Sequence, residues 1–156
     1  LLRKVLEIDP DNLVALQIVG LIVSKNPGGG VEAMEFLSRA ERVNPLDGDT
    51  HNDLALVHAW SDSRDPEAAE RHFREAVRLK PGASNFRSNL GLLLKSVGRT
   101  AEAEEVMLEG LALDPRSAVL HFNIATMYGE GKNWERAESH YREAIDIEPL
   151  APTISV

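Results

Sequence analysis

Residues 84–115 read SNFRSNLGLLLKSVGRTAEAEEVMLEGLALDP, and this stretch decides the fold. Its first half, up to the interruption at Gly98, places large apolar side chains at the spacing of one helix face: Phe86, Leu90, Leu93 and Leu94. Its second half, after Thr100, carries another helical pattern: Ala103, Val106, Met107, Gly110, Leu111 and Leu113. Pro115 ends this pattern, because proline disfavours the α conformation in the residue before it. The stretch therefore predicts two helices joined by a tight turn, named here helix A and helix B.

The same helix pair recurs along the chain. Prolines occur at intervals of 35, 36, 34 and 34 residues, each shortly after the end of an expected helix B. They are Pro10, Pro45, Pro81, Pro115 and Pro149. The pattern predicts further A helices over residues 13–25, 48–60 and 118–129, and further B helices over 32–43, 66–79 and 134–147. Asp65 before Pro66, and Asn133 before Trp134, favour helix starts because their side chains can accept from free backbone N–H groups.

Small residues occupy three fixed positions in every pair. They are Gly20, Ala33 and Ala40; Ala55, Ala69 and Ala76; Gly91, Ala103 and Gly110; and Ala125, Ala137 and Ala144. A larger residue follows the middle one by four positions: Leu37, Phe73, Met107 or Tyr141. This pattern indicates that the two helices of each pair approach closely, with the larger residue filling the remaining volume.

On these residues the chain resembles the tetratricopeptide repeat family, whose 34-residue unit is a helix–turn–helix with this pattern. The resemblance implies an all-α fold, a right-handed α-solenoid of stacked antiparallel helix pairs. We expect one array over residues 1–156. Its parts are helix B of a preceding repeat in 1–10, four repeats in 11–45, 46–81, 82–115 and 116–149, and the start of a further repeat or a tail in 150–156.

Composition excludes several classes of function. The formal net charge of −8 argues against nonspecific nucleic-acid binding, which requires a basic face. No apolar run is long enough to span a membrane, so we expect no membrane contact by this segment. Cysteine is absent, which excludes disulfides and thiolate metal sites. The first residues already have an amphipathic helical pattern, so we expect the segment to be a piece of a longer protein.

Residues with catalytic potential are few, and we expect no catalytic residue, cofactor or metal in this segment. His51 and His58 lie one heptad apart on one expected helix, but zinc usually requires three or four ligands. His121 occupies the position equivalent to His51, which favours a packing role for both. The glycine run at residues 28–30 lacks the spacing of a phosphate-binding loop and favours a turn.

In the tetratricopeptide repeat family the inward stripe of the A helices lines a concave groove that receives peptides. The resemblance assigns this role to Gln17, Ile18, Leu21, Lys25, Asn52, Asp53, Leu56, Asn85, Asn89, Leu92, Lys95, Phe122, Asn123 and Thr126. In family members that bind extended peptides, an asparagine at the position of Asn89 and Asn123 contacts the peptide main chain. An amide can donate to a C=O and accept from an N–H at once, but it can equally bond to a neighbouring A helix. Both interpretations of these asparagines are open at this point.

Three functions are consistent with the sequence. The first is a non-catalytic scaffold that binds a protein or peptide, neutral or basic because the stripe carries few cations and the chain is acidic. The second is the substrate-selecting section of a larger enzyme, such as a protein glycosyltransferase. The third is self-association through apolar ends such as Leu1 and Leu2, which light scattering at several concentrations would test.

Overall fold

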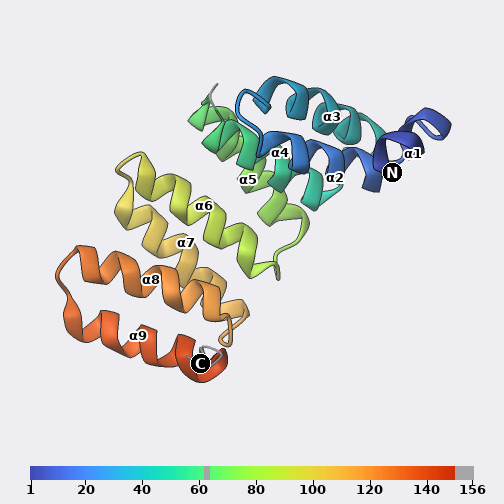
Figure 1. Ribbon diagram of the computed structural model, residues 1–156. Helices are drawn as coiled ribbons and strands as arrows, with labels where there is room; N and C mark the ends of the chain where they lie inside the picture. The colour runs from blue at the N-terminus through green and yellow to red at the C-terminus, as the bar shows by residue number, and fades with distance from the viewer. Residues whose placement is uncertain (62–63, 150–156) are drawn as a thin grey trace, which may run out of the picture. The chain divides into compact units, whose positions relative to one another are not determined.

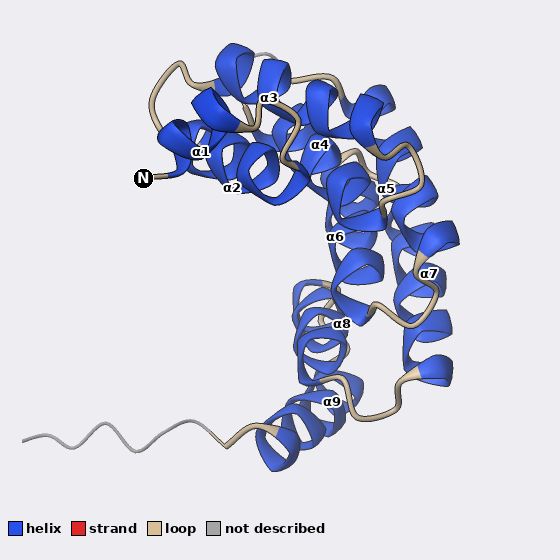
Figure 2. Cartoon of the chain, turned by 90° about the vertical axis from the view of Figure 1, so that its right-hand side faces the viewer, coloured by secondary structure: helices blue, strands red, loops and turns tan. Residues whose placement is uncertain are grey.

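The computed structural model describes residues 1–61 and 64–149, and within these residues every regular element is a helix (Figures 1 and 2). The helices are α1 (Leu2–Ile8), α2 (Leu13–Ser24), α3 (Gly30–Val43), α4 (Gly48–Trp60), α5 (Pro66–Leu79), α6 (Ser84–Ser96), α7 (Thr100–Leu113), α8 (Ala118–Glu130) and α9 (Trp134–Ile147). These bounds agree with the predicted helices to within two residues. The expected element in residues 150–156 lies outside the described residues.

The turn chemistry read from the sequence is confirmed at two helix starts. The Asp65 side chain accepts a hydrogen bond from the Ala68 backbone N–H at 2.9 Å, and Pro66 begins α5. The Asn133 side chain accepts from the Arg136 backbone N–H at 3.3 Å at the start of α9. Gly98 has a φ of 83°, the left-handed conformation that lets the chain leave α6 and turn into α7.

The chain forms two compact units, residues 1–81 and 82–149 within the described part. In unit 1, α2 pairs with α3 and α4 pairs with α5, while α4 also packs on both helices of the preceding pair. Helix α1 packs on α2. In unit 2 the same arrangement is repeated: α6 pairs with α7, α8 pairs with α9, and α8 packs on both α6 and α7.

The small residues let the paired helices approach closely. A Cβ atom added to Gly20 would lie 2.7 Å from Cγ of Leu37, and one added to Gly91 would lie 2.8 Å from Cγ of Met107. The middle small residues, Ala33, Ala69, Ala103 and Ala137, are all buried. Since each helix pair buries its apolar face against the next, the core of each unit is continuous across its two repeats.

Candidate functional site

In unit 1 the residues of the predicted groove form three groups with different surroundings. Gln17 joins its own helix to the next A helix: its Nε2 donates to Oδ2 of Asp47 at 2.6 Å and to Oγ1 of Thr50 at 2.9 Å. Gln17 was predicted from the sequence to contact a ligand, and this link between helices was not predicted. The hydrogen bonds show that Gln17 also holds α2 against the start of α4.

An apolar stripe runs along α2 next to Gln17. Ile18 is 38% exposed, Val14 and Ile22 are more exposed, and Leu21 is partly buried. Lys25, at the C-terminal end of the helix, is exposed. Because these side chains follow the helical repeat, they form one surface that is apolar along most of its length.

On α4 the positions equivalent to Gln17 and Ile18 are polar and buried. Asn52 and Asp53 are both buried, and Nδ2 of Asn52 donates to Oδ1 of Asp53 at 3.4 Å. Burial raises the pKa of the Asp53 carboxyl to about 6; the Asn52 hydrogen bond lowers it, and the charges of Asp49 and Asp47 raise it further. Leu56, one turn along, is partly buried.

In unit 2 the A helices are joined by side chains that the sequence had placed in the groove. Nδ2 of Asn123 donates to Oγ of Ser88 at 2.6 Å, which links α8 to α6. Nζ of Lys95 lies 2.7 Å from a carboxylate oxygen of Glu130, again between α6 and α8. Of the two alternatives for Asn123, the structure shows the contact with the neighbouring A helix.

The remaining groove residues of α6 lie at or near its surface. Asn85 is exposed, whereas Asn89 and Leu92 are partly buried. The peptide-contacting role of Asn89 stays a prediction.

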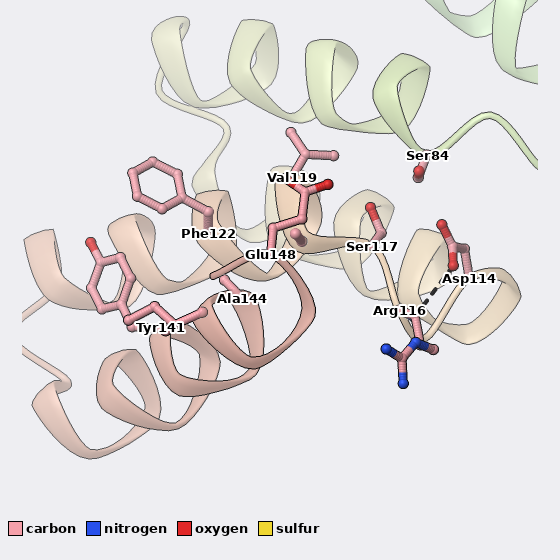
Figure 3. Close-up of a pocket in the computed structure, with 11 residues that line it drawn as sticks. Ser84, Asp114, Arg116, Ser117, Val119, Phe122, Tyr141, Ala144 and Glu148 are labelled. Atoms are coloured by element: carbon pink, nitrogen blue, oxygen red, sulfur yellow. Dashed lines mark hydrogen bonds between the residues drawn. The ribbon is translucent and has the colours of Figure 1, made fainter. Parts of the chain in front are cut away.

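Phe122 lines a cleft formed mainly by α8 and α9, shown in Figure 3 and named here the Phe122 cleft. The cleft has a volume of about 620 Å³ and is lined by Ser84, Asp114, Arg116, Ser117, Ala118, Val119, Phe122, Tyr141, Ala144, Ile145 and Glu148. The Phe122 and Tyr141 rings meet edge to face with centroids 5.7 Å apart. Oγ1 of Thr126 lies 3.2 Å from the Tyr141 hydroxyl, so a polar contact borders the aromatic part of the wall.

Several residues of this cleft were missed from the sequence. Tyr141 was expected to fill the volume between α8 and α9, yet it is only partly buried, and its ring and hydroxyl reach Phe122 and Thr126. Val119 and Ile145 were not singled out, although they are 43% and 50% exposed. A signal was present: Val119 and Phe122 are large apolar residues three apart on the groove side of one helix.

The chain is similar to one known family and to curated proteins of one kind. The sequence profile of the tetratricopeptide repeat family matches residues 30–84, 54–118 and 88–152. Protein O-mannosyl-transferase TMTC3 of Homo sapiens is 27% identical over 111 residues, which are 70% of this chain and 12% of that protein. A protein O-mannosyl-transferase of Caenorhabditis elegans is 32% identical over 80 residues, which are 51% of this chain and 11% of that protein. The chain thus spans about a tenth of the length of these relatives.

Solved structures show the same fold. A crystal structure of MamA superposes with a TM-score of 0.73 at 21% identity, covering 94% of this chain and 84% of that one. YrrB, described as a tetratricopeptide repeat protein with an unusual peptide-binding site, superposes with a TM-score of 0.67 at 26% identity, covering 95% of this chain and 75% of that one. The family profile covers most of the chain and the observed helix pairs match the family's repeat, so this chain belongs to the tetratricopeptide repeat family.

Proposed function

We propose that this chain is a non-catalytic protein-interaction module and that the Phe122 cleft binds a helical segment of a partner protein. The observation that carries the proposal is the exposure of large apolar side chains around one cleft: Val119, Phe122 and Ile145 are 43%, 54% and 50% exposed. Surfaces of this kind are typical of protein interaction sites. The fold supports the same conclusion, because arrays of this family typically act as scaffolds.

A helix is the favoured occupant because unit 2 already contains one in the corresponding place. Phe122 occupies the repeat position of Ser88, and Tyr141 occupies that of Met107. Helix α8 packs on both α6 and α7, and there Ser88 and Met107 are buried. A partner helix lying on α8 and α9 would bury Phe122 and Tyr141 in the same way.

Charge favours a neutral or basic helix. Asp114 and Glu148 lie on the wall of the cleft together with one cation, Arg116. The chain as a whole carries a formal charge of −8. Lys or Arg residues flanking the apolar face of the partner would therefore meet a complementary potential.

The proposal is tested with a panel of synthetic amphipathic peptides that share one apolar face and differ in net charge, measured by fluorescence anisotropy. We expect neutral and basic helical peptides to bind, and we expect Phe122→Ala to weaken binding on the order of tenfold or more. Leu108→Ala is the matched control, because Leu108 is 40% exposed on α7 and does not line the cleft. Binding that is unchanged in Phe122→Ala, or equally tight for proline-disrupted peptides, would refute the proposed site.

A second function is favoured by the match to protein O-mannosyl-transferases: selection of acceptor proteins for a glycosyl-transfer domain elsewhere in a longer protein. In the full-length gene product, Phe122→Ala would then raise KM for a protein acceptor and leave transfer to a short peptide unchanged. This function would be contradicted if Phe122→Ala reduced kcat/KM equally for both acceptors, or if the full-length protein showed no glycosyl transfer. Either result would leave peptide binding by the module intact.

A further inference from the structure

Unit 1 contains a cluster of two histidines and one carboxylate, contributed by three successive helices. Nδ1 of His51 on α4 and Nδ1 of His72 on α5 lie 3.1 Å apart. Oε1 of Glu41 on α3 lies 3.7 Å from the first of these nitrogens and 3.9 Å from the second. The sequence placed His51 and His58 one heptad apart on one helix and did not single out His72. His58 stacks on the His72 ring with centroids 5.7 Å apart.

The orientation of the His51 ring is fixed by the backbone. Its Nε2 lies 2.9 Å from the carbonyl oxygen of Pro45. A carbonyl can only accept, so Nε2 carries the proton, and the neutral ring presents an unprotonated Nδ1 toward His72 and Glu41. Metal-binding histidines commonly donate their second ring N–H to a backbone carbonyl in this way, which fixes the tautomer and raises the basicity of the ligand nitrogen.

The spacing of the three atoms is close to that of a tetrahedral site. Zn²⁺ binds imidazole nitrogen and carboxylate oxygen at about 2.0 to 2.2 Å, which places two tetrahedral ligand atoms about 3.3 Å apart. The observed separation of the two nitrogens is 3.1 Å, and the two nitrogen–oxygen separations of 3.7 and 3.9 Å are slightly longer than that value. The side chains of His72 and Glu41 are 21% and 34% exposed, which leaves a path for the ion and for water as a fourth ligand.

Unit 2 provides a comparison within the same chain. Nδ1 of His121 and Nδ1 of His140 lie 2.9 Å apart, and Nε2 of His121 lies 3.2 Å from the carbonyl oxygen of Pro115. The histidine pair is thus repeated together with its backbone anchor. Glu41 stands four residues before Pro45, and the residue four before Pro115 is Leu111. The pair in unit 2 therefore lacks the carboxylate at this place.

We propose that Glu41, His51 and His72 bind one divalent zinc ion, with Nδ1 of each histidine and a carboxylate oxygen as ligands. Imidazole nitrogen and carboxylate oxygen are both established ligands of Zn²⁺. The ion would join α3 of the first repeat to α4 and α5 of the second, and so stabilise the contact between the two repeats of unit 1.

The experiment is a titration of the metal-free, tag-free chain with ZnCl₂ at pH 7.5 against a chromophoric chelator, together with melting curves with and without zinc. We expect one zinc per chain and a higher Tm with zinc. Glu41→Gln and His72→Gln should each weaken binding by about tenfold or more. His140→Gln should leave binding and the zinc-dependent rise in Tm unchanged. Circular dichroism confirms that each variant folds, and Glu41→Gln, a change at a partly exposed side chain, keeps the test valid if His72→Gln does not fold.

A cobalt(II) spectrum adds a readout that does not depend on stability, because tetrahedral Co²⁺ with nitrogen and oxygen ligands absorbs far more strongly than the hydrated ion. We expect this absorption in the unchanged chain and in His140→Gln, and its loss in Glu41→Gln. The proposal is overturned if no zinc binds below millimolar concentration or if Glu41→Gln binds zinc as tightly as the unchanged chain. It is also overturned if His140→Gln loses as much zinc affinity as His72→Gln.

Discussion

Unit 1 and unit 2 are built on one two-repeat block, and one difference between them is the place of their acidic side chains. Between α4 and α8 the two units align with an offset of 70 residues, which pairs His51 with His121 and Ala55 with Ala125. All four of these residues are buried. The same offset pairs Glu41, Asp47, Asp49 and Asp53 of unit 1 with Leu111, Ser117, Val119 and Asn123 of unit 2.

This difference separates the residues that the fold requires from those that can vary between the two units. Helix pairing requires small residues at fixed places, and both units have them. The four acidic positions are not among these small-residue positions, so unit 1 can place carboxylates there while unit 2 places apolar, hydroxyl and amide side chains. The two ligand chemistries inferred above follow this division: a cation in unit 1, and an apolar helix on unit 2.

The largest effect is expected from enlarging the same small residue in both units. Ala33 on α3 and Ala103 on α7 are fully buried in equivalent places. Ala33→Leu and Ala103→Leu should each lower the free energy of unfolding by about 1 to 3 kcal/mol, because the paired helix leaves no room for the longer side chain. Urea denaturation followed by circular dichroism measures both. If one variant keeps the midpoint of the unchanged chain, the two units do not share the same helix pairing.

A change that makes unit 1 resemble unit 2 tests the acidic difference. Asp53→Asn places in α4 the residue that α8 has at Asn123. The folded pKa of Asp53, about 6, is above its usual 3.8, so the folded state keeps a proton that the unfolded state releases between about pH 4 and pH 6. Burial of this carboxyl therefore costs stability increasingly as pH rises through that window, and the cost is fully present above it.

Asp53→Asn should accordingly be more stable than the unchanged chain above pH 6, by about 1 to 2 kcal/mol once solvent screening is allowed for. Below about pH 4 the two should be equal, because Asp53 is then protonated in both states. Unfolding free energies measured from pH 3.5 to pH 8 give the difference directly. A difference that does not change with pH would mean that Asp53 ionises as it does in water.

The glycines opposite Leu37 and Met107 give a finer comparison. Helix propensity favours Gly20→Ala and Gly91→Ala equally, by about 1 kcal/mol. Against this, the new methyl group meets the branched Cγ of Leu37 in unit 1 and the unbranched chain of Met107 in unit 2. Met107 can change rotamer more readily, so Gly20→Ala should be the less stable variant by about 1 kcal/mol. Thermal melts of the two variants measure this; the reverse order would show that Leu37 is the more adaptable neighbour.

The helix pairs could be predicted from the sequence because they depend on spacing alone. The small residues at the positions of Gly91 and Ala103 recur at fixed intervals, and the helical period of 3.6 residues places them on one face of each helix. The histidine pairs were harder to see, because a longer turn in unit 1 places His72 at 21 residues from His51, whereas His140 is 19 residues from His121. Correcting for that turn would have shown the same pair twice.

The link made by Gln17, and the raised pKa of Asp53, could not be predicted in the same way. Each depends on which rotamer the side chain adopts and on how deeply the neighbouring helix buries it. Residue spacing sets neither quantity. The exposure of Phe122 likewise follows from what packs against α8, which its own repeat does not determine.

The smallest effect is expected at the ion pair between Lys95 and Glu130, whose side chains are 26% and 58% exposed. In unit 1 the position of Glu130 is taken by Trp60, and the Arg64 guanidinium lies 5.8 Å from the centroid of its ring. Glu130→Gln should lower the unfolding free energy by less than about 0.5 kcal/mol, because water screens an exposed pair and both long side chains lose freedom when they form it. The loss should disappear in about 1 M NaCl, where charges are screened within a few ångströms. Urea denaturation at low and high salt measures both values, and a loss that persists at high salt would show that Glu130 stabilises α8 through packing rather than charge.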